Sequence, residues 1–247
     1  MRYWLVMPAA GSGSRFAADG PKQYAPLAGR TVIEWALTPF LADARCAHIV
    51  VALAREDSGW EQVAARLNTR GTSTVTAVRG GAQRSQSVRL ALAGLQGRAQ
   101  PDDWVLVHDA ARPCLDAQDL ERLLGQLGTH PVGGLLAIPA TDTLKRAQGG
   151  EGTGAGVAQT VDRSGLWRAL TPQMFRYARL CAALDRAHAA GRFPSDEAQA
   201  LEWLGEHPLL IEGAATNLKI TTGADLVLAA AVLAARRSQA LGGSSCS

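Results

Sequence analysis

The chain has 247 residues, of which 47% are hydrophobic and 19% charged, and its formal net charge at pH 7 is +3. These values are typical of a globular protein with one large α/β domain or two small ones, and they exclude a disordered chain. The net charge is too small and the arginines are too scattered to indicate nucleic-acid binding, and no apolar run reaches the roughly 18 residues of a membrane-spanning helix. We therefore expect neither a nucleic acid nor a membrane among the partners of this protein.

The basic residues are divided unevenly between the two types. Of the 25, only Lys22, Lys145 and Lys219 are lysine, and all the others are arginine. Lysine carries a compact ammonium on a flexible stem, which the planar guanidinium of arginine does not reproduce. Each of the three lysines therefore marks a position of interest.

The four cysteines, Cys46, Cys114, Cys181 and Cys246, are far apart and form no C-x-x-C pair. This spacing predicts neither a zinc site nor a disulfide framework. The apolar run at the N-terminus is too short for a signal peptide before Pro8 interrupts it. We expect reduced thiols and a cytoplasmic protein.

The first half of the chain alternates between apolar strands and amphipathic helices. Thr31 and Glu34 form a capping-box pattern at the start of one helix, and Asp116 is a suitable N-cap for another. Apolar strands separated by helices are typical of a Rossmann-like α/β fold, a mostly parallel twisted sheet with helices on both faces. Ligands of such sheets bind at the carboxyl ends of the strands. The predicted strands are residues 3–7, 48–53, 74–78, 104–108 and 134–138, and the predicted helices are residues 31–41, 58–67, 86–95 and 116–127.

The glycine-rich residues 8–16 follow the first strand directly. The residue at 16 is Phe16, so both the dinucleotide fingerprint G-x-G-x-x-G and the P-loop fail on spacing. Small residues let backbone N–H groups approach a phosphate, while Arg15 and the later Lys22 could neutralise its charge. The spacing predicts a phosphate-binding loop; the alternative is a tight turn with two exposed basic residues.

Asp109 follows the strand predicted at residues 104–108. A carboxylate at the carboxyl end of a strand could bind substrate hydroxyls, or Mg²⁺ directly or through water. The alternative is an aspartate that caps the turn before Ala110. His108 would point to the opposite face of the strand, so we expect it to be structural.

The alternation of strands and helices breaks between about residues 141 and 165. Residues 143–146 and 157–161 have alternating character and flank a glycine-rich turn, which is typical of a β-hairpin and predicts an arm projecting from the core. The last helix is expected to start at Thr222 with a cap box. The remaining predictions are helices at residues 179–190 and 195–204, a strand at 209–211, a single domain over residues 1–236 and a disordered tail over 237–247.

The loop of residues 9–15, followed by Pro21-Lys22-Gln23-Tyr24, resembles the nucleotidyltransferase signature. The chain is most similar to the 2-C-methyl-D-erythritol 4-phosphate cytidylyltransferases over about residues 3–235. The ordered combination of motifs is far more specific than any one of them. The further matching motifs are Gly80-Gly81 with Arg84 and Ser87, Val107-His108-Asp109-Ala110-Ala111-Arg112-Pro113, Asp142-Thr143-Leu144-Lys145-Arg146, Thr160-Val161-Asp162-Arg163, Leu170-Thr171-Pro172-Gln173, Ser195-Asp196-Glu197-Ala198, Glu212-Gly213 and Asn217-Leu218-Lys219-Ile220-Thr221.

The resemblance implies an enzyme that transfers CMP from CTP to 2-C-methyl-D-erythritol 4-phosphate and releases pyrophosphate. It implies Mg²⁺ or another divalent cation, which Asp109 could bind directly or indirectly, and a homodimer formed through the arm at residues 141–165. Arg163 would then act on the sugar phosphate in the partner subunit's site. The residues implied as catalytic are Arg15, Lys22, Arg163 and Lys219, and those implied as substrate-binding are Ala9, Ala10, Gly11, Gly13, Gly81, Arg84, Ser87, Asp109, Ala110, Arg112, Thr143 and Thr171.

Two positions depart from the family pattern, since Ala82 and Thr216 stand where relatives often carry an acidic residue. The main alternative acceptor is D-ribitol 5-phosphate, because the enzymes that use it share most of these motifs. A dinucleotide-dependent oxidoreductase is disfavoured by Phe16. A non-catalytic regulator would be expected to have lost Arg15 or Lys22, and the chain has both.

Overall fold

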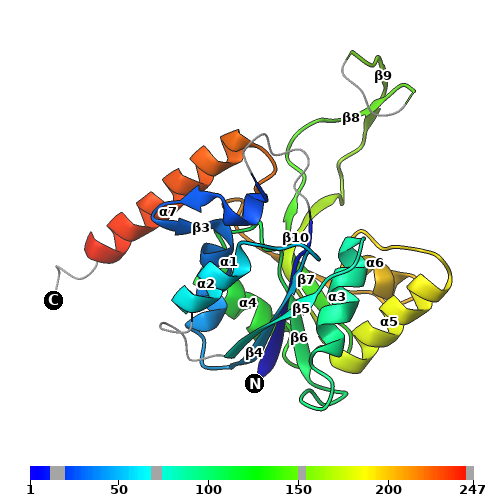
Figure 1. Ribbon diagram of the computed structural model, residues 1–247. Helices are drawn as coiled ribbons and strands as arrows, with labels where there is room; N and C mark the ends of the chain where they lie inside the picture. The colour runs from blue at the N-terminus through cyan, green and yellow to red at the C-terminus, as the bar shows by residue number, and fades with distance from the viewer. Residues whose placement is uncertain (12–19, 68–73, 150–153, 243–247) are drawn as a thin grey trace.

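The computed structural model describes residues 1–11, 20–67, 74–149 and 154–242. A seven-stranded sheet runs through the body of the molecule in the order β11-β7-β10-β6-β1-β4-β5 (Figure 1). All its strand pairs are parallel except those that β10 makes with β6 and β7. The prediction of a mostly parallel sheet is therefore confirmed. The strands are β1 (Tyr3–Ala9), β4 (Cys46–Leu53), β5 (Thr74–Arg79), β6 (Trp104–Val107), β7 (Gly133–Pro139), β10 (Trp167–Arg176) and β11 (Leu209–Glu212).

Helices cover both faces of this sheet, as predicted. Successive residues of a strand point to opposite faces, so Leu5 packs in the core beneath α1, α2 and α4. Val6 packs in the second core, beneath α3, α5 and α6. A third, smaller cluster joins α7 to the short hairpin formed by β2 and β3. These elements are α1 (Val32–Leu41), α2 (Trp60–Leu67), α3 (Arg84–Ala93), α4 (Ala117–Leu127), α5 (Tyr177–Ala189), α6 (Glu197–Glu202), α7 (Gly223–Gly242), β2 (Pro26–Leu27) and β3 (Arg30–Thr31).

β10 is the strand of the seven-stranded sheet that the sequence patterns did not indicate. Its run contains Pro172, and a proline inside a run of residues argues against a central strand because it cannot donate to the ladder. The register of β10 against β7 shifts between Ala169 and Gln173, and Pro172 lies within that irregularity. The proline thus falls where the ladder is already interrupted, so the strand can continue on either side of it.

The arm and the last helix complete the fold. β8 (Leu144–Ala147) and β9 (Val157–Val161) pair antiparallel, and the hairpin they form projects from the body (Figure 1). This confirms the predicted hairpin. The last helix, α7, continues to Gly242, so residues 237–242 are helical rather than part of a disordered tail.

The observed ends of the other helices and strands differ from the predicted ends by about two residues. The helix expected at residues 86–95 is α3, which begins at Arg84, and the one expected at 195–204 is the shorter α6. Within the part of the chain that the structure describes, no helix is both long enough and apolar enough to cross a bilayer.

Candidate active site

A pocket opens where the carboxyl ends of β1 and β6 meet the start of α3. Its lining includes small residues after β1, the loop before α3, and side chains of both charges. Ten of the residues singled out in the sequence thus lie around one cavity, although they are distributed over more than 200 positions of the chain. They are Ala9, Ala10, Gly11, Lys22, Gly81, Arg84, Ser87, Asp109, Ala110 and Lys219.

Small residues shape one wall of the pocket because the loop before α3 packs tightly on the end of β1. A Cβ atom on Gly80 would lie 2.6 Å from the Cβ of Ala10 and 2.9 Å from the Ser87 hydroxyl. The backbone N–H of Gly81 donates to that hydroxyl over 3.1 Å. The buried Gln23 amide donates to the Ala9 carbonyl over 2.9 Å, which ties the segment around Lys22 to β1. This wall presents backbone groups rather than long side chains to a ligand.

Asp109 lies at the centre of a cluster of cations. Its Oδ1 accepts from Arg84 Nε at 3.0 Å, and its Oδ2 lies 2.8 Å from Lys219 Nζ and 3.7 Å from Arg112 Nε. Burial by itself would raise the pKa of this carboxyl, but Arg84, Lys219 and Arg112 together hold the pKa well below its usual range. Asp109 is therefore an anion at any physiological pH.

The charges of the cluster favour an additional anion. Asp109 faces three cations, and Arg112 in turn has its pKa lowered by burial and by the nearby charges of Arg84 and Arg168. Phosphate oxygens accept hydrogen bonds from guanidinium and ammonium groups, and they complement such an excess of positive charge. The pocket is suited to a phosphorylated ligand.

Glu197 belongs to this cluster, although the sequence reasoning assigned it no role. It is the first residue of α6 and is fully buried. Its carboxylate accepts two hydrogen bonds from Arg84, of 2.6 Å and 3.1 Å. In the sequence it stands behind Asp196 at the start of a helical run, a pattern that indicates only a helix cap. No local signal reveals a partner that is 113 residues away.

Thr171 and Arg112 lie behind the pocket rather than in its lining. The Thr171 hydroxyl accepts from the backbone N–H of Asp109 over 3.1 Å and contacts the His108 ring at 2.9 Å. Arg112 donates to the backbone carbonyl of Asn217 over 2.7 Å. Both residues thus support the loops that carry Asp109 and Lys219. His108 is fully buried on the other side of this turn, which agrees with the structural role expected for it.

The two predicted site residues of the arm are exposed. Thr143 lies just before β8, and Arg163 lies just after β9, where its guanidinium donates to the backbone carbonyl of Thr141. Neither contributes to the pocket of its own chain as the described residues define it. Arg15 and Gly13, which were predicted to bind phosphate, lie outside the described residues.

The donor atoms available to a metal are few. No group of three or more His, Cys, Asp or Glu side chains that could hold a metal occurs among the described residues. Asp109 is the only carboxylate among the described residues that line the pocket. Mg²⁺ commonly binds through one or two carboxylates together with substrate phosphates and water. A single carboxylate therefore fits a divalent cation that is coordinated mainly by the phosphates of a ligand.

Comparison with known proteins identifies the family. Residues 3–235 match the family model of 2-C-methyl-D-erythritol 4-phosphate cytidylyltransferase. An enzyme of that name from Halorhodospira halophila is 53% identical over 237 residues, which is 96% of each chain. Another from Pseudomonas aeruginosa is 51% identical over 226 residues, covering 91% of this chain and 93% of the relative.

Solved structures agree with the sequence relatives. The fold resembles a crystal structure of 4-diphosphocytidyl-2C-methyl-D-erythritol synthase with a TM-score of 0.78 and 37% identity, over 94% of this chain and 99% of that one. It also resembles the cytidylyltransferase of Thermus thermophilus, with a TM-score of 0.74 and 33% identity over 94% and 98% of the two chains. The chain therefore belongs to the 2-C-methyl-D-erythritol 4-phosphate cytidylyltransferase family.

Proposed function

We propose that this protein is the cytidylyltransferase that converts CTP and 2-C-methyl-D-erythritol 4-phosphate into 4-diphosphocytidyl-2-C-methyl-D-erythritol and pyrophosphate, in the non-mevalonate route to isoprenoids. The observation that carries the proposal is the pocket itself, in which Arg84 and Lys219 bind Asp109, and Lys22 joins them in the lining beside a wall of small residues. Membership of the family supplies the identity of the two substrates.

The reaction joins two phosphates. An oxygen of the acceptor phosphate attacks the α-phosphorus of CTP, a new P–O bond forms, and the bond to the leaving pyrophosphate breaks. Negative charge spreads over the phosphoryl oxygens in the transition state, so catalysis depends on positioning and on charge neutralisation. Lys22, on the short helix Lys22–Tyr24 that Gln23 ties to β1, is proposed to neutralise that charge. Arg15 is proposed to do the same from the preceding loop.

The two substrates are assigned to the two ends of the pocket. Cytosine and ribose suit the wall formed by Ala9, Ala10 and Gly81, where backbone groups can read the edge of a base. The acceptor phosphate suits the end that carries Lys219, whose side chain is 39% exposed and can turn toward a ligand. Asp109 lies beside Lys219 in the same pocket, where its carboxylate can accept hydrogen bonds from substrate hydroxyls.

Three further assignments belong to this proposal. Asp109 would hold a Mg²⁺ ion directly or through water, and the ion would supply positive charge against the phosphates of CTP. The arm supports a homodimer, because Arg163 is exposed and lies outside the pocket of its own chain. We propose a cytoplasmic location, a compartment in which thiols such as those of Cys114 and Cys181 stay reduced.

The test is a pyrophosphate-release assay on the purified protein with CTP and Mg²⁺. We expect release with 2-C-methyl-D-erythritol 4-phosphate and little release with D-ribitol 5-phosphate. The opposite preference would assign the protein to the other acceptor. A parallel reaction without Mg²⁺, in the presence of a chelator, should release no pyrophosphate, and undiminished release would refute the proposed cation.

A further inference from the structure

We propose that Glu197 is a positioning residue for the transferase, which holds the Arg84 guanidinium so that it contacts Asp109 with one edge only. The inference rests on the proposed function, since Arg84 and Asp109 line the pocket assigned to the substrates. Glu197 does not line that pocket, so its effect would pass through Arg84.

The geometry divides the hydrogen-bond donors of Arg84 between two carboxylates. Nη1 and Nη2 donate to the two oxygens of Glu197 over 2.6 Å and 3.1 Å, and Nε donates to Asp109 over 3.0 Å. A guanidinium prefers to bind a carboxylate through two parallel hydrogen bonds. Glu197 occupies that paired arrangement, which leaves a single bond for Asp109.

Because Arg84 gives Asp109 only one hydrogen bond, the second carboxylate oxygen of Asp109 is left for Lys219. Oδ2 remains with Lys219, at 2.8 Å, and does not contact Arg84 by hydrogen bonding. Without Glu197, the Nη groups of Arg84 would lose their carboxylate partner. The guanidinium could then bind both oxygens of Asp109 and compete with Lys219 for Oδ2. The lysine and the carboxylate would then lose the arrangement in which they meet the substrates.

Glu197 is itself firmly placed. The side-chain oxygen of Gln173 on β10 accepts from the backbone N–H of Ala198 over 2.9 Å, and its amide nitrogen donates to Asp196 over 3.0 Å. These bonds fix the start of α6 on the central sheet. Asp196 in turn accepts from the backbone N–H of Gln199, which completes the cap. The sheet that carries Asp109 thus also anchors the residue that holds Arg84.

The experiment compares Glu197→Gln with a matched control. Arg89 lies on the same helix, α3, as Arg84, and binds Asp185 of α5 in a similar fork of 2.7 Å and 3.0 Å, but outside the pocket. We expect Glu197→Gln to lower kcat/KM by about tenfold or more, whereas Asp185→Asn should stay within about twofold of the wild type. Equal effects of the two substitutions would overturn the proposal.

A double substitution separates positioning from stability. If Glu197 acts through Arg84, then Arg84→Gln/Glu197→Gln should be no less active than Arg84→Gln alone. A structural role would instead make the two losses in kcat/KM multiply, and that result would overturn the proposal. Should Glu197→Gln fail to fold, Glu197→Asp is the second variant. The shorter aspartate keeps the negative charge but moves the carboxylate away from the two Nη groups of Arg84, so it should lower kcat at an unchanged Tm. A kcat of Glu197→Asp equal to that of the wild type would contradict the role of Glu197 in positioning Arg84.

One readout does not depend on activity. The Arg84 Nη protons, which Glu197 accepts in the wild type, should exchange with solvent at least about tenfold faster in Glu197→Gln than in the wild type, measured by ¹⁵N NMR, and the Asp185→Asn protein should show no change. Unchanged Arg84 exchange in Glu197→Gln would refute the positioning role even in a protein without transferase activity. Inactivity of the wild type toward the acceptor would refute only the proposed function.

Discussion

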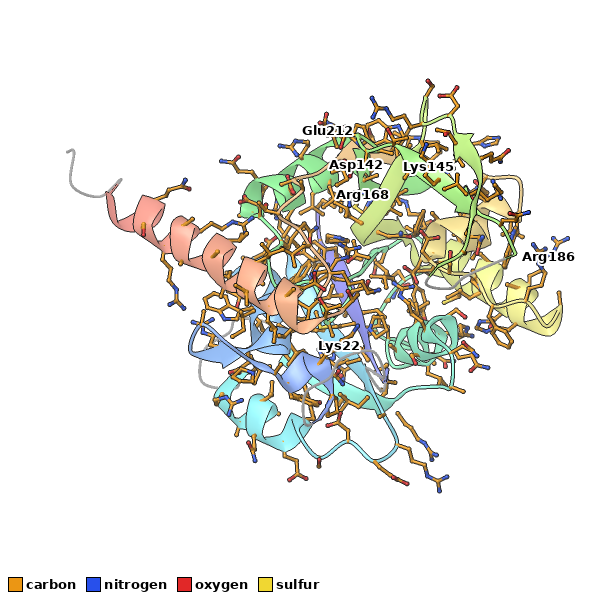
Figure 2. All side chains as sticks on the ribbon, turned by 90° about the horizontal axis from the view of Figure 1, so that it is seen from above. Lys22, Asp142, Lys145, Arg168, Arg186 and Glu212 are labelled. Atoms are coloured by element: carbon orange, nitrogen blue, oxygen red, sulfur yellow. The ribbon has the colours of Figure 1, made fainter. Side chains whose placement is uncertain are left out.

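At the scale of single residues, the three lysines of the chain have different environments. Lys22 and Lys219 line the pocket, and Lys219 pairs with Asp109. Lys145 lies on the exposed arm, where its ammonium donates to the Thr160 hydroxyl over 2.7 Å. Figure 2 shows Lys145 well separated from Lys22 in the view from above. The chain thus keeps two of its three lysines where a compact, mobile charge can meet phosphates.

This difference predicts which lysines tolerate arginine. Lys22→Arg and Lys219→Arg should be poorly active, because a planar guanidinium cannot follow a phosphate through the reaction as an ammonium does. Lys145→Arg should have near wild-type kcat/KM, since its hydrogen bond lies on the arm surface.

Lys22→Ala should lower kcat by about 10²-fold or more if the lysine stabilises transition-state charge. Steady-state kinetics measure kcat and KM of the variant. A change in KM alone would contradict a role of Lys22 in stabilising the transition state.

His108 gives the protein a specific pH dependence of stability. Burial lowers the pKa of its imidazole from the ordinary 6.5 to about 4. Between these two values the unfolded chain binds a proton that the folded chain does not, so the free energy of unfolding falls as the pH falls from 6.5 toward 4. Above pH 6.5 the histidine is neutral in both states and this contribution disappears.

We therefore expect His108→Asn to reduce the acid sensitivity of the fold. Between about pH 7.5 and pH 5, the wild type should lose about 2 kcal/mol of stability that the variant retains, on a slope of about 1.4 kcal/mol per pH unit for one group. Urea unfolding at both pH values measures the difference. The comparison cancels the other histidines, and parallel pH profiles for the two proteins would contradict the expectation.

At the scale of elements, local capping patterns were the most reliable guide to structure. The Thr31–Glu34 box at the start of α1 and the Asp116 cap of α4 are both present. Asp225 accepts from the backbone N–H groups of Thr221 and Thr222, as the cap box predicted. These signals succeed because both partners lie within four residues of each other. β10, by contrast, is stabilised by β6 and β7, which are distant in sequence.

The cap of α7 has a testable contribution to stability. Asp225→Ala removes the acceptor for two backbone donors at the helix start, which should lower the free energy of unfolding by about 1 kcal/mol. Asp225→Asn keeps an acceptor oxygen and should lose only part of that amount. Urea titrations of both variants provide the measurement. Equal stability of the alanine variant and the wild type would show that solvent satisfies these donors.

At the scale of the whole molecule, the pocket and the arm lie on different parts of the chain's surface. The arm that carries β8 and β9 extends away from the body (Figure 1). Arg163 does not line the pocket defined by the described residues. Under the proposed function, a complete site would combine the pocket of one protomer with the arm of its partner. Two copies related by a twofold axis would each complete the other's site.

Mixed dimers test this arrangement. Arg163→Ala and Lys22→Ala each inactivate a different part of the proposed composite site, so a heterodimer would contain one intact site. Mixing the two variants after dissociation should restore about a quarter to a half of wild-type activity. Each variant dissociated and reassociated alone is the control. Activity no higher than that of either parent would mean that Arg163 acts within its own chain.

The sequence alone determined the class of the sheet, the arm, most helices and strands, and the residues around the pocket that belong to ordered motifs. The helices and strands are encoded by hydrophobic period and capping, which depend on near neighbours in the chain, whereas most residues of the pocket were indicated by the resemblance to a known family. Only the tertiary structure determined that β10 lies inside the sheet between β7 and β6, that Thr171 and Arg112 support the pocket from behind, and that Glu197 holds Arg84. The reason is physical: a buried charge is stable where it finds a partner, and the partner's place in space is set by the packing of the whole fold.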